Sequence, residues 1–143
     1  MSGPVPFVTP LKRIPAPGGA VMHAIKGTEK SFAGFGEAYF STVDTGAVKG
    51  WKRHNRMTLN LVVPVGLVEF VIHDDSGAAE EPFRSFVIGA PGDYARLTVP
   101  PGLWMAFCGR ADGLNLVLNV ASIEHDPDEV DRAELAVFPW TFV

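Results

Sequence analysis

Residues 46–66 read GAVKGWKRHNRMTLNLVVPVG, and this stretch joins a cluster of charge to an apolar strand. The first half carries five basic side chains within eight residues, namely Lys49, Lys52, Arg53, His54 and Arg56. The second half, residues 59–63, is an apolar, β-branched run bounded by Pro64 and Gly66, which predicts a buried strand. Cations that precede a core strand either form a solvated rim or point into a cavity. Because unpaired buried cations are unfavourable, the cavity alternative predicts an anionic ligand such as phosphate.

The composition is that of an ordinary globular protein, with 47% apolar and 20% charged residues, and we expect one domain over residues 1–143. A net charge of −4 gives no overall field that favours nucleic acid or anionic lipid, so neither is an expected partner. No apolar run approaches the length of a membrane span, and no secretory signal is evident. Together with the single Cys108, which excludes an internal disulfide, this predicts a cytoplasmic protein.

Fifteen Gly and twelve Pro divide the chain into short pieces, which favours strands and turns. Residues 1–20 contain five prolines and are expected to form an extended arm, buried either as an edge strand or against a neighbouring subunit. Asp126 and Pro127 begin an expected short C-terminal helix that reaches about Ala136. The pattern predicts an all-β antiparallel sandwich or barrel, which would hold a ligand in its mouth. Further strands are expected at 67–73, 83–88, 94–99, 103–108 and 114–121.

Four segments follow one another along the chain: FAGFGEAY at 32–39, VKGWKRH at 48–54, VPPGLWMAF at 99–107 and IEHDPDE at 123–129. In this order they resemble the cupin enzymes that isomerise nucleotide-linked keto sugars, such as the dTDP-4-dehydrorhamnose 3,5-epimerases and the dTDP-4-keto-6-deoxyglucose 3,4-ketoisomerases. The resemblance spans roughly residues 30–140. It implies a cupin barrel (a double-stranded β-helix or jelly roll), a homodimer without a cofactor, and proton transfer next to the keto group of a dTDP-linked 4-keto-6-deoxy sugar for surface-polysaccharide assembly.

The resemblance also implies roles for individual residues in substrate binding. The family's phenylalanine and glutamate near the nucleotide base match Phe35 and Glu37, and an arginine that holds the diphosphate matches Lys49. A base-stacking tyrosine of the family falls near His125. Side chains from neighbouring strands are expected to complete the substrate site, with Arg56, Asn60, Arg96, Trp104 and Asn119 as the candidates.

Two positions are the catalytic candidates, because the paired histidines of the ketoisomerases fall on Lys52 and His54. The catalytic tyrosine of the epimerases would lie near Asn119 or Val120, and neither is a phenol, so a one-base isomerisation is favoured. His54 would move the proton while Lys52 and Arg56 stabilise the oxyanion. Alternatively, neighbouring cations lower the pKa of Lys52 and make it the base. A third alternative is a catalytically silent cupin that binds a sugar nucleotide without turnover.

Two further elements of the family pattern have no counterpart in the sequence. The aspartate that supports the epimerase histidine would follow Trp140, where this sequence has no carboxylate. Many cupins bind a metal through a His-x-His pair, whereas the four histidines here are scattered at 23, 54, 73 and 125. We therefore expect no metal.

Overall fold

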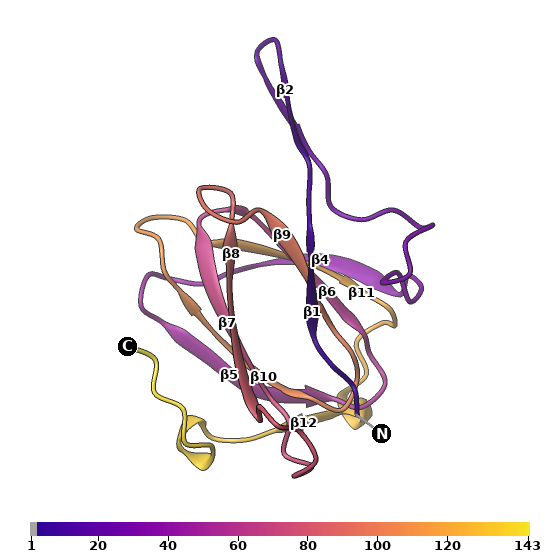
Figure 1. Cartoon of the computed structure of the whole chain (residues 1–143), viewed down its shortest axis with the longest axis vertical. Helices are drawn as coiled ribbons and strands as arrows, with labels where there is room; N and C mark the ends of the chain where they lie inside the picture. The colour runs from indigo at the N-terminus through magenta and orange to yellow at the C-terminus, as the bar shows by residue number, and fades with distance from the viewer. Residues whose placement is uncertain (1–2) are drawn as a thin grey trace.

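The computed structural model describes residues 3–143 and consists of two five-stranded sheets that face each other, with a separate two-stranded hairpin (Figure 1). The first sheet has the order β1 (Phe7–Pro10), β9 (Ala95–Val99), β6 (Leu59–Val65), β11 (Leu116–Ala121) and β4 (Glu37–Thr42). The second sheet has the order β12 (Val130–Arg132), β5 (Val48–His54), β10 (Trp104–Gly109), β7 (Leu67–His73) and β8 (Phe83–Gly89). Neighbouring strands within both sheets are antiparallel, which confirms the expected all-β cupin fold.

The core lies between the two sheets, because alternate residues of facing strands point inward and remove apolar surface from water. The alternation predicted for residues 67–73 is confirmed by β7, which has the same bounds. Its other face packs against aromatic residues outside the barrel, so Val71 is fully buried as well. The inward set includes Leu59, Leu61 and Val63 of β6 and Val68, Phe70 and Ile72 of β7.

The chain changes sheets at Gly66, because β6 belongs to the first sheet and β7 to the second. Gly66 has φ +87°, and a Cβ there would lie 2.4 Å from Oδ1 of Asn115, so glycine is required by both conformation and space. The same Asn115 oxygen accepts hydrogen bonds from the backbone N–H of Leu67 at 2.9 Å and of Ala111 at 3.3 Å. Asn115 therefore fixes this crossing rather than binding a ligand.

The N-terminal arm begins as a strand and continues as a projecting hairpin. β1 pairs with β9 at the edge of the first sheet, which is one of the two arrangements expected for the arm. Beyond it, β2 (Arg13–Ala16) and β3 (Gly19–Met22) form a hairpin that extends away from the barrel (Figure 1). Ile14 is 45% exposed and Val21 is 54% exposed, so the hairpin presents apolar side chains to its surroundings.

The prediction of a C-terminal helix is wrong beyond the first turn. Asp126 does cap the turn, since its Oδ1 accepts from the backbone N–H of Asp128 at 3.0 Å, and Pro127 follows as predicted. However, the 3-10 turn η1 (Pro127–Glu129) leads into β12, whose backbone pairs with β5, and a second 3-10 turn η2 (Leu135–Val137) follows. Pairing with the open edge of β5 satisfies backbone groups that a helix would otherwise satisfy internally. Within residues 3–143, no helix has the length and apolarity needed to cross a membrane.

Candidate functional site

A cavity of about 160 Å³ lies between the two sheets. Its exposed lining residues include Tyr39 on β4 and Lys49 and Lys52 on β5, so its mouth opens between these two strands. Apolar side chains line its depth, and the polar groups converge from the walls. The lining consists of Tyr39, Ser41, Lys49, Gly50, Lys52, His54, Leu59, Leu61, Phe70, Met105, Phe107, Val117 and Asn119.

Four of the five basic residues predicted from the sequence lie on β5, where their side chains divide between the two faces of the strand, and Arg56 follows the end of the strand. Lys49, Lys52 and His54 line the cavity, as the cavity alternative requires. Trp51 is buried on the outer face, and Arg53 also points outward to bind Asp131, with Nη2 2.7 Å from Oδ2. The cluster is therefore neither wholly a solvated rim nor wholly interior.

A β-bulge at Gly50 brings both lysines to the cavity. In strict alternation Lys49 and Lys52, three residues apart, would face opposite sides. The β5–β10 ladder shifts register here, so that Gly50 and Trp51 together oppose Ala106. Gly50 has φ +151°, and a Cβ there would lie 2.4 Å from the Cβ of Ala106. Glycine at position 50 is thus what permits two cations on one wall.

His54 forms a close pair with a buried carboxylate. Its Nδ1 lies 2.5 Å from Oε1 of Glu129, and its side chain is 12% exposed. Glu129 is 3% exposed, and its second oxygen accepts from the backbone N–H of Asn55, Arg56 and Met57 at 3.0, 2.9 and 3.3 Å. The turn that follows β5 therefore wraps around the Glu129 carboxylate and fixes it against the ring of His54.

The protonation of this pair follows from its contacts. Burial by itself raises the pKa of Glu129, but hydrogen bonds from His54 and from the backbone N–H of Arg56 and Met57 outweigh it, so the pKa is lowered overall. An ionised carboxylate only accepts hydrogen bonds, and so Nδ1 of His54 carries the proton. No hydrogen-bond partner of Nε2 is found among residues 3–143, so this nitrogen is available to a ligand in the cavity.

Lys52 provides positive charge at the mouth. Partial burial, followed by repulsion from Arg132 and Lys49, lowers the pKa of Lys52. Lys49 donates a hydrogen bond of 2.6 Å to the backbone oxygen of Thr42, whereas Lys52 has no carboxylate within salt-bridge distance in the described part of the chain. Lys49, Lys52 and Arg132 have no carboxylate within salt-bridge distance among residues 3–143, so the positive charge beside the cavity is suited to an anion. Arg132, which lies opposite Lys52 on β12 and does not itself line the cavity, was not among the predicted residues.

Three of the predicted substrate-binding residues face away from the cavity, which corrects the sequence-based assignment. Arg96 is fully buried on the outer face of the first sheet, where Nη2 lies 2.6 Å from Oε2 of Glu29. Asn60, on the same face, donates to the backbone oxygen of Ser31 at 3.0 Å. Both residues hold the segment between β3 and β4 against the sheet. Trp104 is buried among aromatic residues outside the second sheet, and its Nε1 donates to Asp75.

The remaining predicted residues lie outside the cavity lining, at the end of the barrel where β4 begins. Arg56 has a 59% exposed side chain and pairs with Asp126 at 2.6 Å. Glu37 accepts a hydrogen bond of 3.0 Å from the backbone N–H of His125, so these two residues are joined. Phe35 precedes them and is 66% exposed. Contacts of Phe35, Glu37 and His125 with a nucleotide stay a prediction.

Two further residues at the site were not predicted from the sequence. Glu129 falls within the helix predicted from Asp126 onward, and no local pattern indicates that it meets His54, which lies 75 residues earlier. Tyr39 is the last residue of the segment FAGFGEAY, which assigns it no role, but the register of β4 and β11 places it directly beside Asn119, which donates a 3.2 Å hydrogen bond to its oxygen. Within residues 3–143, no group of three His, Cys, Asp or Glu side chains is arranged to hold a metal ion.

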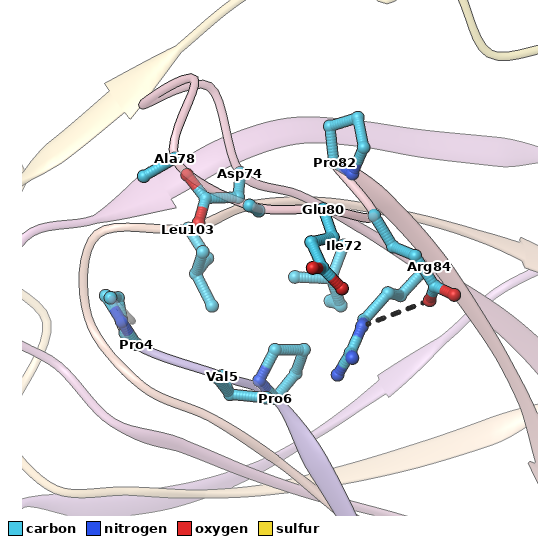
Figure 2. Close-up of a pocket in the computed structure, with 13 residues that line it drawn as sticks. Pro4, Val5, Pro6, Ile72, Asp74, Ala78, Glu80, Pro82, Arg84 and Leu103 are labelled. Carbon is cyan, nitrogen blue, oxygen red and sulfur yellow. Dashed lines mark ion pairs between the residues drawn. The ribbon is translucent and has the colours of Figure 1, made fainter. Parts of the chain in front are cut away.

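A second and larger recess, of about 480 Å³, lies between the N-terminal residues 3–6 and the loop that joins β7 to β8 (Figure 2). Its polar lining is mainly acidic, with carboxylates from Asp74, Glu80 and Glu81. Its one lining cation, Arg84, already pairs with Glu81 at 3.6 Å. Negative charge repels a phosphate group, so the cavity between the sheets is the better candidate for an anionic ligand.

Solved structures of known proteins resemble this chain. A dTDP sugar isomerase from Desulfovibrio desulfuricans G20 is 35% identical in sequence, with a TM-score of 0.86, over 95% of this chain and 89% of that one. A 3'-monoepimerase from Streptomyces bikiniensis, in complex with dTDP-quinovose, is 13% identical, with a TM-score of 0.80, over 94% and 74% of the two chains. A sugar 3,4-ketoisomerase from Thermoanaerobacterium thermosaccharolyticum, in complex with TDP, is 17% identical, with a TM-score of 0.73, over 90% and 88%.

No protein-family model and no curated protein matches the chain. The two structures of low identity support the fold alone, whereas the similarity to the dTDP sugar isomerase extends over almost the whole chain at 35% identity. By that similarity, the chain belongs to the cupin superfamily of sugar-nucleotide isomerases and epimerases.

Proposed function

We propose that the protein isomerises or epimerises a nucleotide-linked 4-keto-6-deoxy sugar of the dTDP type, by proton transfer at a carbon next to the keto group. The observation that carries the proposal is the contact of His54 with the buried Glu129, because His54 lines a cavity whose mouth also carries Lys52. A histidine held by an ionised carboxylate is suited to accept a proton, because the carboxylate stabilises the imidazolium that forms.

In the proposed reaction, Nε2 of His54 takes the proton from the carbon beside the keto group. The electrons of the broken C–H bond form a carbon–carbon double bond, and the keto oxygen becomes an oxyanion. Return of a proton to the same carbon on its other face gives an epimer. If the neighbouring carbon bears a hydroxyl group, transfer of the hydroxyl proton and protonation of the former keto carbon move the keto group instead.

Lys52 fits the role of electrostatic partner better than that of base. Its ammonium group donates hydrogen bonds and carries the charge that an oxyanion or a phosphate needs nearby. The carboxylate of Glu129 contacts His54, and Lys52 has no comparable acceptor among the described residues. His54 is therefore the proposed base, with Lys52 stabilising negative charge on the substrate.

The cavity is large enough to hold only part of a nucleotide-linked sugar. At about 160 Å³ it is smaller than the roughly 300–1,000 Å³ typical of pockets that enclose a drug-sized ligand. We therefore place the sugar inside, with the diphosphate at the mouth beside Lys49, Lys52 and Arg132. The nucleoside would lie outside the cavity, where Phe35 offers an exposed aromatic ring for stacking.

Incubation with dTDP-4-keto-6-deoxyglucose in heavy water tests the proposal. We expect deuterium to enter at C3 or C5 of the sugar, detected by mass spectrometry and NMR, and we expect the variant His54→Asn to abolish this uptake. His23→Asn is a matched control, because His23 does not line the cavity. Absence of deuterium from the sugar with the unaltered protein would contradict the proposal for this substrate.

Calorimetry with dTDP and UDP, combined with the deuterium experiment, distinguishes an enzyme from a protein that only binds the nucleotide. An enzyme of the proposed class binds one of these nucleotides and also exchanges protons. Binding without deuterium uptake would instead indicate a catalytically silent cupin, and binding of neither nucleotide would contradict both functions.

A homodimer is part of the same proposal. A two-stranded hairpin is marginally stable in water when nothing covers it. The β2–β3 hairpin projects from the barrel and exposes Ile14 and Val21, and β1 adds Phe7 and Val8, which are each 43% exposed. A second copy of the chain would bury these side chains.

A further inference from the structure

The side chain of Asn55, the first residue after β5, is bonded to the segment that carries Glu129. Its Nδ2 donates one hydrogen bond of 3.0 Å to the backbone oxygen of Glu129 and a second of 3.1 Å to Oδ2 of Asp131. The backbone N–H of Asn55 donates to the same backbone oxygen at 2.9 Å and to Oε2 of Glu129 at 3.0 Å. One residue therefore holds Glu129 by its backbone and by its carboxylate.

The chemistry of its two partners fixes the orientation of the Asn55 amide. A backbone carbonyl oxygen only accepts hydrogen bonds, and so does an ionised carboxylate. Hydrogen bonds from Asn55 and Arg53 lower the pKa of Asp131, so this carboxylate is ionised near neutral pH. The NH₂ end must face both partners and uses both of its protons. A carboxylate at position 55 would repel both acceptors, and a hydroxyl group has only one proton to donate.

Asp131 is itself held in place, so the amide of Asn55 is anchored at both ends. Arg53 donates to Oδ2 of Asp131 through Nε at 3.0 Å and through Nη2 at 2.7 Å. The guanidinium carbon of Arg53 lies 4.8 Å from the centroid of the Trp104 ring, and Trp104 is buried outside the second sheet. These contacts connect the start of β12 to the aromatic layer of that sheet.

The bonds of Asn55 lie where the backbone changes direction. The turn η1 ends at Glu129 and β12 begins at Val130, so a displaced backbone at this junction would move the carboxylate. The contact of Oε1 with Nδ1 of His54 is 2.5 Å, and a contact this short tolerates little displacement.

We propose that Asn55 is a positioning residue for the reaction, and that it acts on His54 through Glu129. This inference rests on the proposed function. Asn55 does not line the cavity, so it neither touches the substrate nor moves a proton. It keeps Oε1 of Glu129 on the Nδ1 proton of His54, and Nε2 is then free to accept. Without the amide, the ring would also populate the tautomer whose proton lies on Nε2, which is not a base.

A double-variant cycle tests the inference. We expect Asn55→Ala to lower kcat by about 10- to 100-fold, with a much smaller change in KM, because a misplaced general base slows the proton transfer more than it weakens binding. In a protein that already carries Glu129→Gln, the same change should have almost no further effect on kcat, since the positioned carboxylate is absent. Losses that multiply would show that Asn55 does not act through Glu129, and would overturn the inference.

Two variants separate the hydrogen bonds from general disturbance of a loop. Asn55→Asp keeps the size of the side chain but places a carboxylate against the backbone oxygen of Glu129 and against Asp131, so its kcat should fall at least as far as that of Asn55→Ala. Thr45→Val is the matched control, because Thr45 also donates from an exposed loop to a distant backbone oxygen, that of Ala111 at 2.7 Å, outside the cavity. It should keep the kcat of the unaltered protein.

Nitrogen-15 NMR of labelled histidine gives a readout that needs no turnover. We expect the proton of neutral His54 on Nδ1 in the unaltered protein, and partly on Nε2 in Asn55→Ala. An unchanged tautomer in this variant would overturn the inference, and so would an unchanged kcat. Failure of the proposed function looks different, because the unaltered protein would then take up no deuterium from heavy water, while the NMR spectrum would still report whether Asn55 orients the pair.

Discussion

The Nδ1 atom of His54, at the end of β5, lies 2.5 Å from Oε1 of Glu129, which is 75 residues further along the chain. The turn η1 delivers the carboxylate, and β12 holds it there by pairing with β5 immediately afterwards. Because the same carboxylate also accepts three backbone N–H groups, the imidazole is oriented by a rigid partner. The strand pairing at the edge of the second sheet thus positions the carboxylate that orients the proposed base.

Replacement Glu129→Gln should lower kcat by about 10²- to 10⁴-fold, because an amide does not stabilise the imidazolium and can present the wrong tautomer of His54. Steady-state kinetics with the sugar nucleotide would measure this, and KM should change much less. Asp128→Asn is the control, since Asp128 is exposed and its side chain takes no part in the pair. A kcat of Glu129→Gln equal to that of the control would show that the pair has no catalytic role.

The folded protein should become less stable as the pH falls and Glu129 takes up a proton. Its pKa is lowered in the folded protein, so the unfolded chain binds the proton more tightly. The resulting stabilisation is fully present above the ordinary pKa of a glutamate and is lost as the pH falls through the lower folded value. Urea unfolding between neutral pH and about pH 3 should show this loss, and Glu129→Gln should reduce its slope. Equal slopes for the two proteins would contradict the assignment.

Much of the fold could be predicted because its strands follow simple patterns. Residues 67–73 alternate between apolar and mixed positions, and Val68 and Phe70 do face the core. The direction of Lys52 and His54 could be stated as one of two alternatives, since an apolar strand follows them closely. These features could be predicted from local patterns because successive side chains of a strand point to opposite faces of the sheet.

The parts of the site that could not be predicted depend on contacts between distant segments. Arg96 alternates with apolar residues in β9, and the sequence does not say which face is covered by the segment that contains Glu29. Nor does it reveal the bulge at Gly50, which depends on the register of β5 against β10. Glu129 escaped for a similar reason, because the helix start is also a valid local interpretation of its surroundings.

Binding of dTDP should weaken as the pH rises in the alkaline range. Partial burial and the charges of Arg132 and Lys49 lower the pKa of Lys52, so it loses its proton at a lower pH than an ordinary lysine. Calorimetry across this range should show the loss, and Lys52→Met should bind about tenfold more weakly at neutral pH with a flatter pH profile. Lys30→Met, at an exposed position outside the cavity, should behave as the unaltered protein. Unchanged affinity in Lys52→Met would exclude Lys52 from the anion site.

Gly50→Ala should disturb the site through the backbone. The added Cβ would meet Ala106 at 2.4 Å, and the φ of +151° is unfavourable for alanine. We expect a loss of roughly 1–3 kcal/mol in the free energy of unfolding, together with weaker dTDP binding as Lys49 and Lys52 shift. Gly27→Ala is the control, because a Cβ there has no neighbour within 4 Å and Gly27 lies outside the hairpin. If urea unfolding gave equal midpoints for both variants, the bulge would not require glycine.

Light scattering should give twice the mass of one chain, because the exposed hairpin needs a surface to cover it. The double change Ile14→Lys and Val21→Lys places two charges on that hairpin, and we expect it to shift the equilibrium toward monomer as the protein is diluted. Leu114→Lys changes an apolar residue that is 53% exposed in the loop before β11, and it should leave the mass unchanged. A monomer at every concentration of the unaltered protein would contradict the homodimer. Equal masses for the hairpin variant and the control would instead place the interface elsewhere on the barrel, because a contact through β2 and β3 does not tolerate two buried, unpaired lysines.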